Sequence, residues 1–276
     1  FGCSVPAVMA TRTLPSRRDR LLTVLLVPFM SCSAKVPVYG LIAAAVFPRH
    51  VALVILCLYA LGMLLSVITA FFLRHTFLRG EASPFLLELP PYRFPTIRTL
   101  ARLVWRHAKE FLVRAFTIIL LVTLVIWFLE TYDFQFFPAS SPDASMLSVI
   151  AQRIATLFRP LGFDRWEPVG ALLAGFSAKE TIISTLTVAM SGMGTTLSEA
   201  LRQIMTTPAA LSFLVFVSLY TPCAAAVTVM RRELNIRGGF FLIILCQTLL
   251  AWIAAFFVYR LSLLFERSMP LFIVSL

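Results

Sequence analysis

The chain has 276 residues, 59% of them hydrophobic, and its mean hydropathy is +0.90. These values exclude an ordinary soluble domain and are typical of a membrane protein with several spans. The formal net charge of +11 would suit a nucleic-acid-binding protein. The basic residues, however, lie in short loops beside apolar segments, as the positive-inside rule predicts, so we expect no nucleic-acid binding.

Six apolar segments are long enough to cross roughly 30 Å of hydrocarbon, which takes about 20 helical residues. In chain order they are Leu21–Phe47, Val51–Leu73, Phe111–Leu129, Trp166–Met190, Leu211–Met230 and Phe240–Leu264. Residues 1–11 resemble the end of a further segment, and neither an initiator Met nor a signal peptide precedes them. The sequence thus predicts an all-α, polytopic membrane protein with about six transmembrane segments plus a truncated N-terminal one.

Two of the six segments contain short interruptions that include a cysteine. The first segment has prolines at positions 28 and 37 on either side of Ser31-Cys32-Ser33, and the fifth contains Tyr220-Thr221-Pro222-Cys223. Proline removes a backbone donor and clashes with the preceding turn, which predicts discontinuous helices at both places. Irregular backbone at membrane depth occurs where it lines a cavity, and broken helices of this kind form the binding sites of transporters.

The interruptions also indicate an internal repeat. Residues 32–38 match residues 223–229 at Cys, Ala and two Val positions, and residues 1–6 align with residues 176–181. The alignment predicts two pseudo-symmetric halves whose broken segments occupy corresponding positions, which is the best sequence indication of a transport site.

The adjacent pair Lys179-Glu180 lies within the apolar segment Trp166–Met190. Charged groups near the middle of a membrane cost several kcal/mol, roughly, and usually serve an ion route, a proton relay or a buried partner. We favour Glu180 as a carboxylate on a cation route, with Lys179 as its counter-charge or as a gate. The alternative is that both residues only lock helix packing, and the same choice applies to Lys35 at the first interruption.

Cys3, Cys32 and Cys223 each lie at an interruption, next to proline or a small polar residue. Thiolates bind soft or borderline divalent ions such as Fe(II), whereas hard ions prefer oxygen ligands. We therefore consider these three cysteines candidate metal contacts, with oxygen atoms of Ser31, Ser33, Ser177 and Thr221 as additional ligands. A cysteine that only fills space as a small buried hydrophobe is the alternative, and it fits Cys57 and Cys246 in the uninterrupted spans.

Loop charges give the orientation of the first spans. The loops at 12–20 and 74–110 are basic, whereas 131–165 is balanced in charge, so the first two are expected inside the cell and the third outside. The basic stretch before residue 111 is also amphipathic. It is either a helix on an anionic membrane surface or an ordinary cytoplasmic loop.

Strict alternation of the spans then places the basic segment 231–237 outside the cell, against the positive-inside rule. A re-entrant hairpin in either Trp166–Met190 or Leu211–Met230 would restore the expected side. Both segments contain an interruption suited to such a hairpin.

Five motifs together resemble the FeoB family of ferrous iron transporters. They span nearly the whole chain and occur in the order of the family. They are Phe1-Gly2-Cys3-x-Val5-Pro6, Pro28-Phe29-Met30-Ser31-Cys32-Ser33-Ala34-Lys35-Val36-Pro37, Leu86-Leu87-Glu88-Leu89-Pro90-Pro91-Tyr92-Arg93, Ala178-Lys179-Glu180 and Pro222-Cys223.

The resemblance implies paired gate-type repeats with broken helices. The first repeat would occupy residues 1–73, a cytoplasmic loop residues 74–110, and the second repeat region with the C-terminal span residues 111–276. It also implies Fe(II) transport across the bacterial cytoplasmic membrane into the cytoplasm, past a midplane site. The cysteines of the family's motifs fall on Cys3, Cys32 and Cys223, which makes these residues candidates for the iron path.

Family members begin with a cytoplasmic GTP-binding domain, which this sequence lacks, and no Walker-type phosphate loop occurs in it. We therefore expect a transporter piece rather than an enzyme, with no bound cofactor besides the transported Fe(II), and with GTP and Mg on the family's other domain. The implied partners are that GTPase domain, in cis or as a separate chain, small Feo accessory proteins, membrane lipid and a further copy of the chain in a homo-oligomer.

Three other functions compete with iron transport. The same architecture would serve a permease for a nucleoside or another small solute, although few polar side chains able to hold a base or sugar are present. A membrane thiol oxidoreductase would need a Cys-x-x-Cys pair or a quinone-facing His, and neither occurs in the sequence. A non-transporting assembly subunit is disfavoured because every gate motif is retained.

Overall fold

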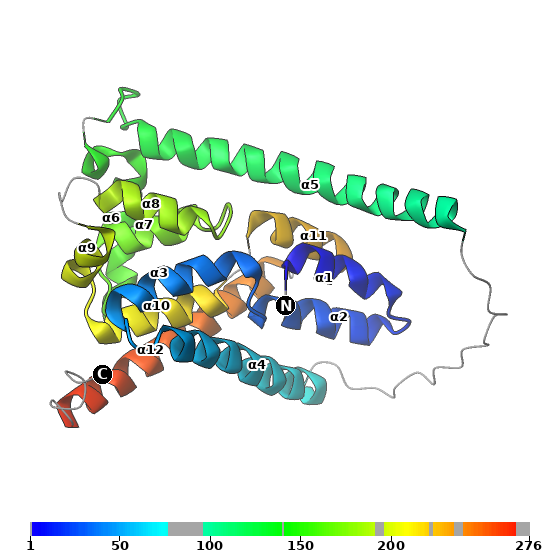
Figure 1. Ribbon diagram of the computed structural model, residues 1–276, viewed down its shortest axis with the longest axis horizontal. Helices are drawn as coiled ribbons and strands as arrows, with labels where there is room; N and C mark the ends of the chain where they lie inside the picture. Colours follow the sequence, from blue (N-terminus) through cyan, green and yellow to red (C-terminus); the bar gives the residue numbers. More distant parts are fainter. Residues whose placement is uncertain are drawn as a thin grey trace.

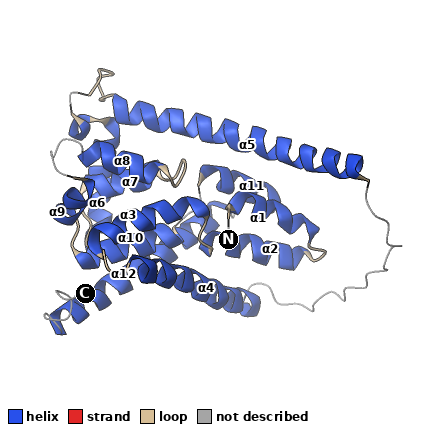
Figure 2. Cartoon of the chain, viewed as in Figure 1, coloured by secondary structure: helices blue, strands red, loops and turns tan. Residues whose placement is uncertain are grey.

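The computed structural model describes residues 2–76, 96–139, 141–190, 196–220, 223–234 and 240–268. Within these residues the chain is helical and contains no β-strand, which confirms the all-α prediction (Figure 2). The helices are α1 (Ser4–Ala10), α2 (Arg17–Leu26), α3 (Val36–Val46), α4 (Val51–Thr76), α5 (Ile97–Thr131), α6 (Met146–Phe158), α7 (Trp166–Ala174), α8 (Thr181–Met190), α9 (Leu197–Ile204), α10 (Thr207–Leu219), α11 (Ala224–Leu234) and α12 (Phe240–Ser268).

Four stretches of the described chain are long and apolar enough to cross a membrane. They are Arg17–Val46, Val51–Thr76, Thr207–Leu234 and Phe240–Glu266. These stretches correspond to four of the six predicted spans, so the chain is a multi-pass membrane protein. The predicted span Phe111–Leu129 lies within α5, and the predicted span Trp166–Met190 divides into two short helices, α7 and α8.

The short helices α7 and α8 pack side by side, and the turn between them points toward the middle of the molecule (Figure 1). They therefore form a hairpin that begins and ends on the same side. Neither helix is long enough to cross roughly 30 Å of hydrocarbon alone, because an α-helix rises only about 1.5 Å per residue. This geometry supports the re-entrant interpretation of Trp166–Met190.

A salt bridge shows that two basic segments lie at one end of the molecule. Arg12 follows α1, and its Nε donates a hydrogen bond of 2.7 Å to Oε1 of Glu233 near the end of α11. Arg231 and Arg232 of α11 are therefore on the same side as the basic loop 12–20, as the positive-inside rule requires. The re-entrant hairpin thus removes the conflict in the charge pattern. Residues 235–237 lie outside the described part of the chain.

Helix α5 is a single helix of 35 residues. Its first part, Ile97–Lys109, contains most of the amphipathic stretch that the sequence placed in a cytoplasmic loop, and it runs directly into the apolar part Phe116–Thr131. The stretch is therefore helical and continuous with a membrane segment. The remainder of the predicted loop, including the Leu86–Arg93 motif, is outside the described residues.

The core of the protein surrounds α10. Every residue of this helix from Pro208 to Leu219 except Leu211 is buried, and α10 packs against α12, α3 and α4. The helix is apolar all round, which is the pattern of a helix enclosed on every side. Its Ser212 hydroxyl is satisfied by the carbonyl of Ala255 in α12 at 3.1 Å. This enclosed helix ends at the second predicted interruption and so places it inside the protein.

Gly62 of α4 lies against the first interruption. A Cβ added at this position would be 2.7 Å from the backbone oxygen of Phe29, whereas one added at Gly40 of α3 would meet nothing within 4 Å. Replacing a helical glycine with alanine normally stabilises a helix by about 1 kcal/mol. We expect this gain for Gly40→Ala, but a net loss of about 1–3 kcal/mol for Gly62→Ala, because α4 must move away from rigid backbone.

Thermal unfolding of the two variants in detergent tests this contact. A higher midpoint for Gly40→Ala and a lower one for Gly62→Ala are expected. Equal shifts for the two variants would show that α4 does not hold the interruption in place.

Candidate functional site

The interruptions meet in the middle of the molecule. In each half, a backbone hydrogen bond joins the cysteine-containing interruption to a second irregular segment. In the first half the N–H of Ser33 donates to the carbonyl of Gly2 at 3.0 Å, and in the second half the N–H of Ala224 donates to the carbonyl of Phe176 at 2.8 Å. Ser33 and Ala224 are equivalent in the sequence alignment of the halves, whereas Gly2 and Phe176 differ by one position. The shared bond supports the predicted repeat.

The first interruption has the predicted discontinuity. Helix α2 ends at Leu26, a short 3-10 turn (Val27–Phe29) and an extended segment follow, and a second 3-10 turn (Ser33–Lys35) leads into α3. Pro28 and Pro37 both occupy the first turns of helical segments. Proline is tolerated there, because the missing N–H would have no partner within the helix. Pro37 therefore starts α3 rather than interrupting it.

The second interruption follows α10. The helix ends at Leu219, Tyr220 has an extended backbone, and α11 starts at Ala224. Thr221 and Pro222 lie outside the described residues, so the proposed oxygen ligand at Thr221 is not placed. The discontinuity predicted for this segment is confirmed by the two separate helices.

All three candidate cysteines lie immediately before a helical segment. Cys3 is the N-cap residue of α1, Cys32 is the N-cap residue of the 3-10 turn that leads into α3, and Cys223 directly precedes α11. Helix starts carry a partial positive charge that favours negative groups, such as a thiolate, at these positions. Cys3 is exposed, and Cys32 and Cys223 are partly buried.

The candidate ligands share one region. Cys3 interacts electrostatically with Cys223, Cys32 and Glu180. Within the described ranges, no three or more His, Cys, Asp or Glu side chains are arranged to hold a metal ion. The structure therefore gathers the candidates around the centre without giving them the geometry of a closed metal site.

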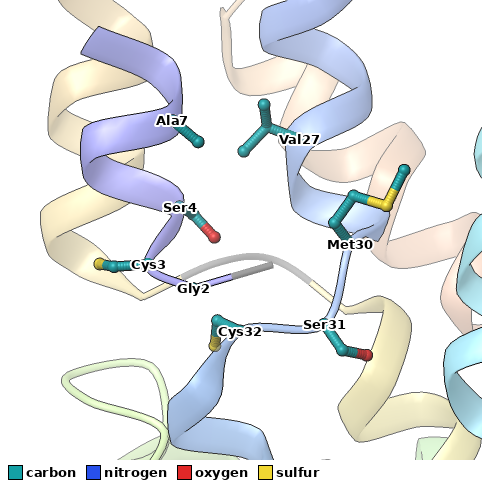
Figure 3. Close-up of a pocket in the computed structure, with 8 residues that line it drawn as sticks. All are labelled: Gly2, Cys3, Ser4, Ala7, Val27, Met30, Ser31 and Cys32. Carbon is teal, nitrogen blue, oxygen red and sulfur yellow. The ribbon is translucent and has the colours of Figure 1, made fainter. Parts of the chain in front are cut away.

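A cavity of about 240 Å³ lies between the N-terminal segment and the first interruption. Figure 3 shows its lining: the sulfur atoms of Cys3 and Cys32 point in different directions, and the Met30 side chain extends away from both cysteines. Its lining residues are Gly2, Cys3, Ser4, Ala7, Val27, Met30, Ser31 and Cys32. Sulfur and hydroxyl groups thus line a space large enough for a partly hydrated ion.

Two buried lysines connect the parts of this centre. The Nζ of Lys35 donates a hydrogen bond of 2.5 Å to the carbonyl of Ser218, near the end of α10. The Nζ of Lys179 lies 3.0 Å from the centre of the Tyr220 ring. Each lysine is only 3% exposed, and both interact electrostatically with Cys32 and Cys223. The lysines therefore link the first interruption and the hairpin to the end of α10.

The remaining candidates have separate surroundings. Glu180 is exposed although its neighbour Lys179 is buried, so the two adjacent charges occupy different environments. The hydroxyl of Ser177 is bound to the carbonyl of Ala174 at 2.8 Å, and Ser33 contributes its backbone N–H to the inter-segment bond. The hydroxyl of Ser31 lies 3.3 Å from that of Tyr39.

The expectation for the other two cysteines was wrong. Cys57 of α4 and Cys246 of α12 are exposed rather than buried. Both belong to helices of span length whose surfaces are largely uncovered by the rest of the chain. An apolar span looks the same in sequence whether a given side faces protein or lipid, so only the packing distinguishes these surfaces.

Sequence reasoning did not single out Tyr39 and Ser218. Tyr39 is completely buried in α3 beside Ser31, and the Ser218 carbonyl is the acceptor for Lys35. One signal was available for Ser218. Its carbonyl would normally accept a helical bond from residue 222, which is proline and has no N–H.

Comparison with known proteins gives two family matches. Residues 55–106 match the family described as "Ferrous iron transport protein B C terminus", and residues 112–237 match the gate family described as "Nucleoside recognition". The interval between the two matches falls within α5. No solved structure matches the chain.

Several curated relatives match nearly the whole chain. The Fe(2+) transport protein A/Fe(2+) transporter FeoB fusion protein of Porphyromonas gingivalis is 35% identical over 96% of the chain and 37% of its own length. The Fe(2+) transporter FeoB of Methanocaldococcus jannaschii is 34% identical over 92% of the chain and 39% of its own length. That of Campylobacter jejuni is 39% identical over 84% of the chain and 40% of its own length. The chain thus spans about two fifths of the length of these relatives.

Proposed function

Because the chain belongs to the FeoB family in its membrane region, we propose that it forms the path by which Fe(II) crosses the membrane into the cytoplasm. The observation that carries this proposal is the meeting of broken helices at one centre, with Cys3, Cys32 and Cys223 each at the start of a helical segment. Broken helices around a central site are the usual architecture of a transport route.

At this centre Fe(II) would exchange part of its water shell for protein ligands. Cys32 and Cys223 supply thiolates, Cys3 lines the adjoining cavity, and backbone carbonyls with Glu180 complete the shell. Thiolate ligands favour Fe(II) over Mg(II) and Ca(II), which prefer oxygen. The ligands would assemble around the ion as the two halves move relative to each other, since no complete ligand set is present beforehand among the described residues.

Lys35 and Lys179 would balance the negative charge that Cys32 and Cys223 carry when they act as thiolate ligands. Both lysine side chains are buried and interact electrostatically with Cys32 and Cys223. An uncompensated charge at this depth would be costly, so a thiolate and a neighbouring lysine ammonium favour each other's charged form. When a divalent cation arrives, it would neutralise the thiolates in place of the lysines. Ion binding would thereby be linked to the contacts of Lys35 with Ser218 and of Lys179 with Tyr220.

The further parts of the proposal concern the complete transporter. GTP and Mg would bind to the family's cytoplasmic GTPase domain and regulate transport by this membrane region. The fusion of Fe(2+) transport protein A to one relative favours a small Feo protein as a partner. We place the protein in the cytoplasmic membrane of a bacterium, with surrounding lipid and with further copies of the chain as additional partners.

Uptake of Fe(II) by proteoliposomes tests the function. The chain is reconstituted with and without an FeoB-type GTPase domain, under reducing conditions, and Mn(II) and Zn(II) are added as competitors. We expect Fe(II) to accumulate, and we expect Zn(II), which also binds thiolates, to compete. No uptake by folded protein, even with the GTPase domain present, would contradict the proposal.

A nucleoside is the second candidate substrate, because residues 112–237 match a family described as "Nucleoside recognition". The same vesicles can be tested with a radiolabelled nucleoside. Nucleoside uptake that Fe(II) does not inhibit, in vesicles that fail to accumulate Fe(II), would favour this second candidate.

A further inference from the structure

The turn between α5 and α6 is held tightly by its own backbone. Within it, the N–H of Asp133 donates to the carbonyl of Phe137 and the N–H of Phe136 to the carbonyl of Asp133, both at 2.9 Å. The carboxylate of Asp133 accepts the N–H of Phe134 at 2.6 Å. Two more bonds of 2.9 Å, Ala139 N–H to Thr131 and Met146 N–H to Tyr132, fix its ends to the helices. The turn is therefore a rigid structure.

Phe136 has a backbone conformation that is unfavourable for its residue type. Its φ is 58°, which makes it the one non-glycine residue with positive φ in the described part of the chain. Glycine adopts this left-handed conformation without steric cost, whereas a bulky residue is strained in it. Strain of this kind persists when the surrounding structure holds the residue in place, and strained residues cluster at functional positions.

The turn presents three phenylalanine rings to the outside. Phe134, Phe136 and Phe137 are 55%, 68% and 70% exposed. Three exposed rings in four residues would be unfavourable in water, since each carries a large apolar surface. Their exposure indicates that the turn contacts an apolar environment outside the chain.

The position of the turn identifies that environment. The apolar part of α5, Phe116–Thr131, ends directly before it, and this part has an exposed apolar surface. Its exposed members are Phe116, Leu120, Leu121, Leu124, Val125 and Trp127. The rings of Phe128 and Tyr132 stack at 4.8 Å, and the Phe136 ring lies 6.2 Å from that of Phe128. The surface of α5 that faces lipid thus continues onto the turn through touching aromatic rings.

We propose that residues 132–137 form a lipid anchor, in which Phe134, Phe136 and Phe137 insert at the boundary between headgroups and acyl chains. Aromatic side chains are enriched at this boundary. The acidic group of the turn, Asp133, is compatible with that depth because its carboxylate is bonded to the backbone.

The anchor also fixes how deep the contact between Glu130 and Thr185 lies in the bilayer. Glu130 lies three residues before Asp133, and its carboxylate accepts a hydrogen bond of 2.7 Å from the hydroxyl of Thr185 in α8. Helix α8 is the second arm of the hairpin that carries Lys179 and Glu180. A turn anchored in lipid therefore holds α5, and through Glu130 the hairpin, at a constant position relative to the bilayer.

Photocrosslinking in phospholipid vesicles tests the anchor. Benzoylphenylalanine, which is close to phenylalanine in shape, is placed at Phe136, and at the polar neighbour Gln135 as a matched control. After irradiation, mass spectrometry should show phospholipid adducts with a yield at least fivefold higher at position 136. Equal yields at the two positions, no lipid adduct at position 136, or crosslinks to a second copy of the chain would each overturn the proposal.

Phe136→Gly separates anchoring from folding. Glycine relieves the strained φ, so this variant should unfold in detergent at the same temperature as the wild type or higher. The gain in unfolding temperature on transfer from detergent to phospholipid vesicles should be smaller than for the wild type. An unchanged gain would show that the ring does not contact lipid. Gln135→Gly is the control and should keep the full gain.

Discussion

Replacing both Cys32 and Cys223 with serine is expected to lower Fe(II) uptake by the complete transporter roughly tenfold or more, since each 1.4 kcal/mol of lost binding is a factor of about ten. Both residues directly precede helical segments at the centre and interact electrostatically with Cys3 or with the two buried lysines. Serine retains the size of cysteine but replaces a soft sulfur ligand with a hydroxyl. The change therefore removes the ligand chemistry and leaves the packing nearly intact.

The chain provides a matched control for this experiment. Cys57→Ser plus Cys246→Ser changes the same number of thiols on exposed helix surfaces away from the centre. Uptake of radiolabelled iron under reducing conditions is measured for both double variants at equal protein content. Loss of uptake in both, or in neither, would contradict the assignment of Cys32 and Cys223 as ligands.

Replacing Lys35 with methionine is expected to destabilise the protein by about 1–3 kcal/mol, the cost of leaving a buried polar group without a partner. The group in question is the carbonyl of Ser218. Pro222 cannot donate the helical bond to it, and Lys35 donates instead at 2.5 Å from the other half of the molecule. Because this contact joins the two halves, Lys35→Met should also reduce Fe(II) uptake.

A second substitution tests this explanation of the lysine. Pro222→Ala restores an N–H at the position from which a continued helix would satisfy Ser218. It should therefore recover part of the stability lost in Lys35→Met, as measured by thermal unfolding in detergent. Lys109→Met, at an exposed position of α5, serves as the control and should unfold like the wild type. No recovery in the double variant would show that Lys35 stabilises the protein in another way.

The helical segments and their interruptions were largely predictable from the sequence, because they depend on local chemistry. Apolar runs of about 20 residues define the spans, and Pro28 and Cys223 mark real discontinuities. The interruption predicted at Pro37 was wrong, because this residue starts α3. Proline either breaks a helix or starts one, and the choice depends on where the chain has already turned.

The orientation of Trp166–Met190 could not be predicted from the sequence. Loop charges allowed re-entry in either of two segments, and only the packing of α7 against α8 and the pair Arg12–Glu233 select the first. The alignment of the halves pairs Cys32 with Cys223, and both directly precede a helical segment. It gave no sign that Lys35 would reach Ser218, 183 residues away in the sequence. Such contacts depend on how the halves pack, which local patterns do not encode.

The placement of the cysteines at helix starts has a consequence for the speed of transport. Several positively charged features gather around the centre, and each of them repels a cation. They are the partly positive starts of α1, α3, α8 and α11 and the two buried lysines. A ferrous ion held there by thiolates would be bound in an unfavourable potential, so its dwell time would be short. Fast conduction requires ligands strong enough to select an ion and a background that expels it again. In this centre the cysteine sulfur atoms would select Fe(II), and the positive helix starts would promote its release.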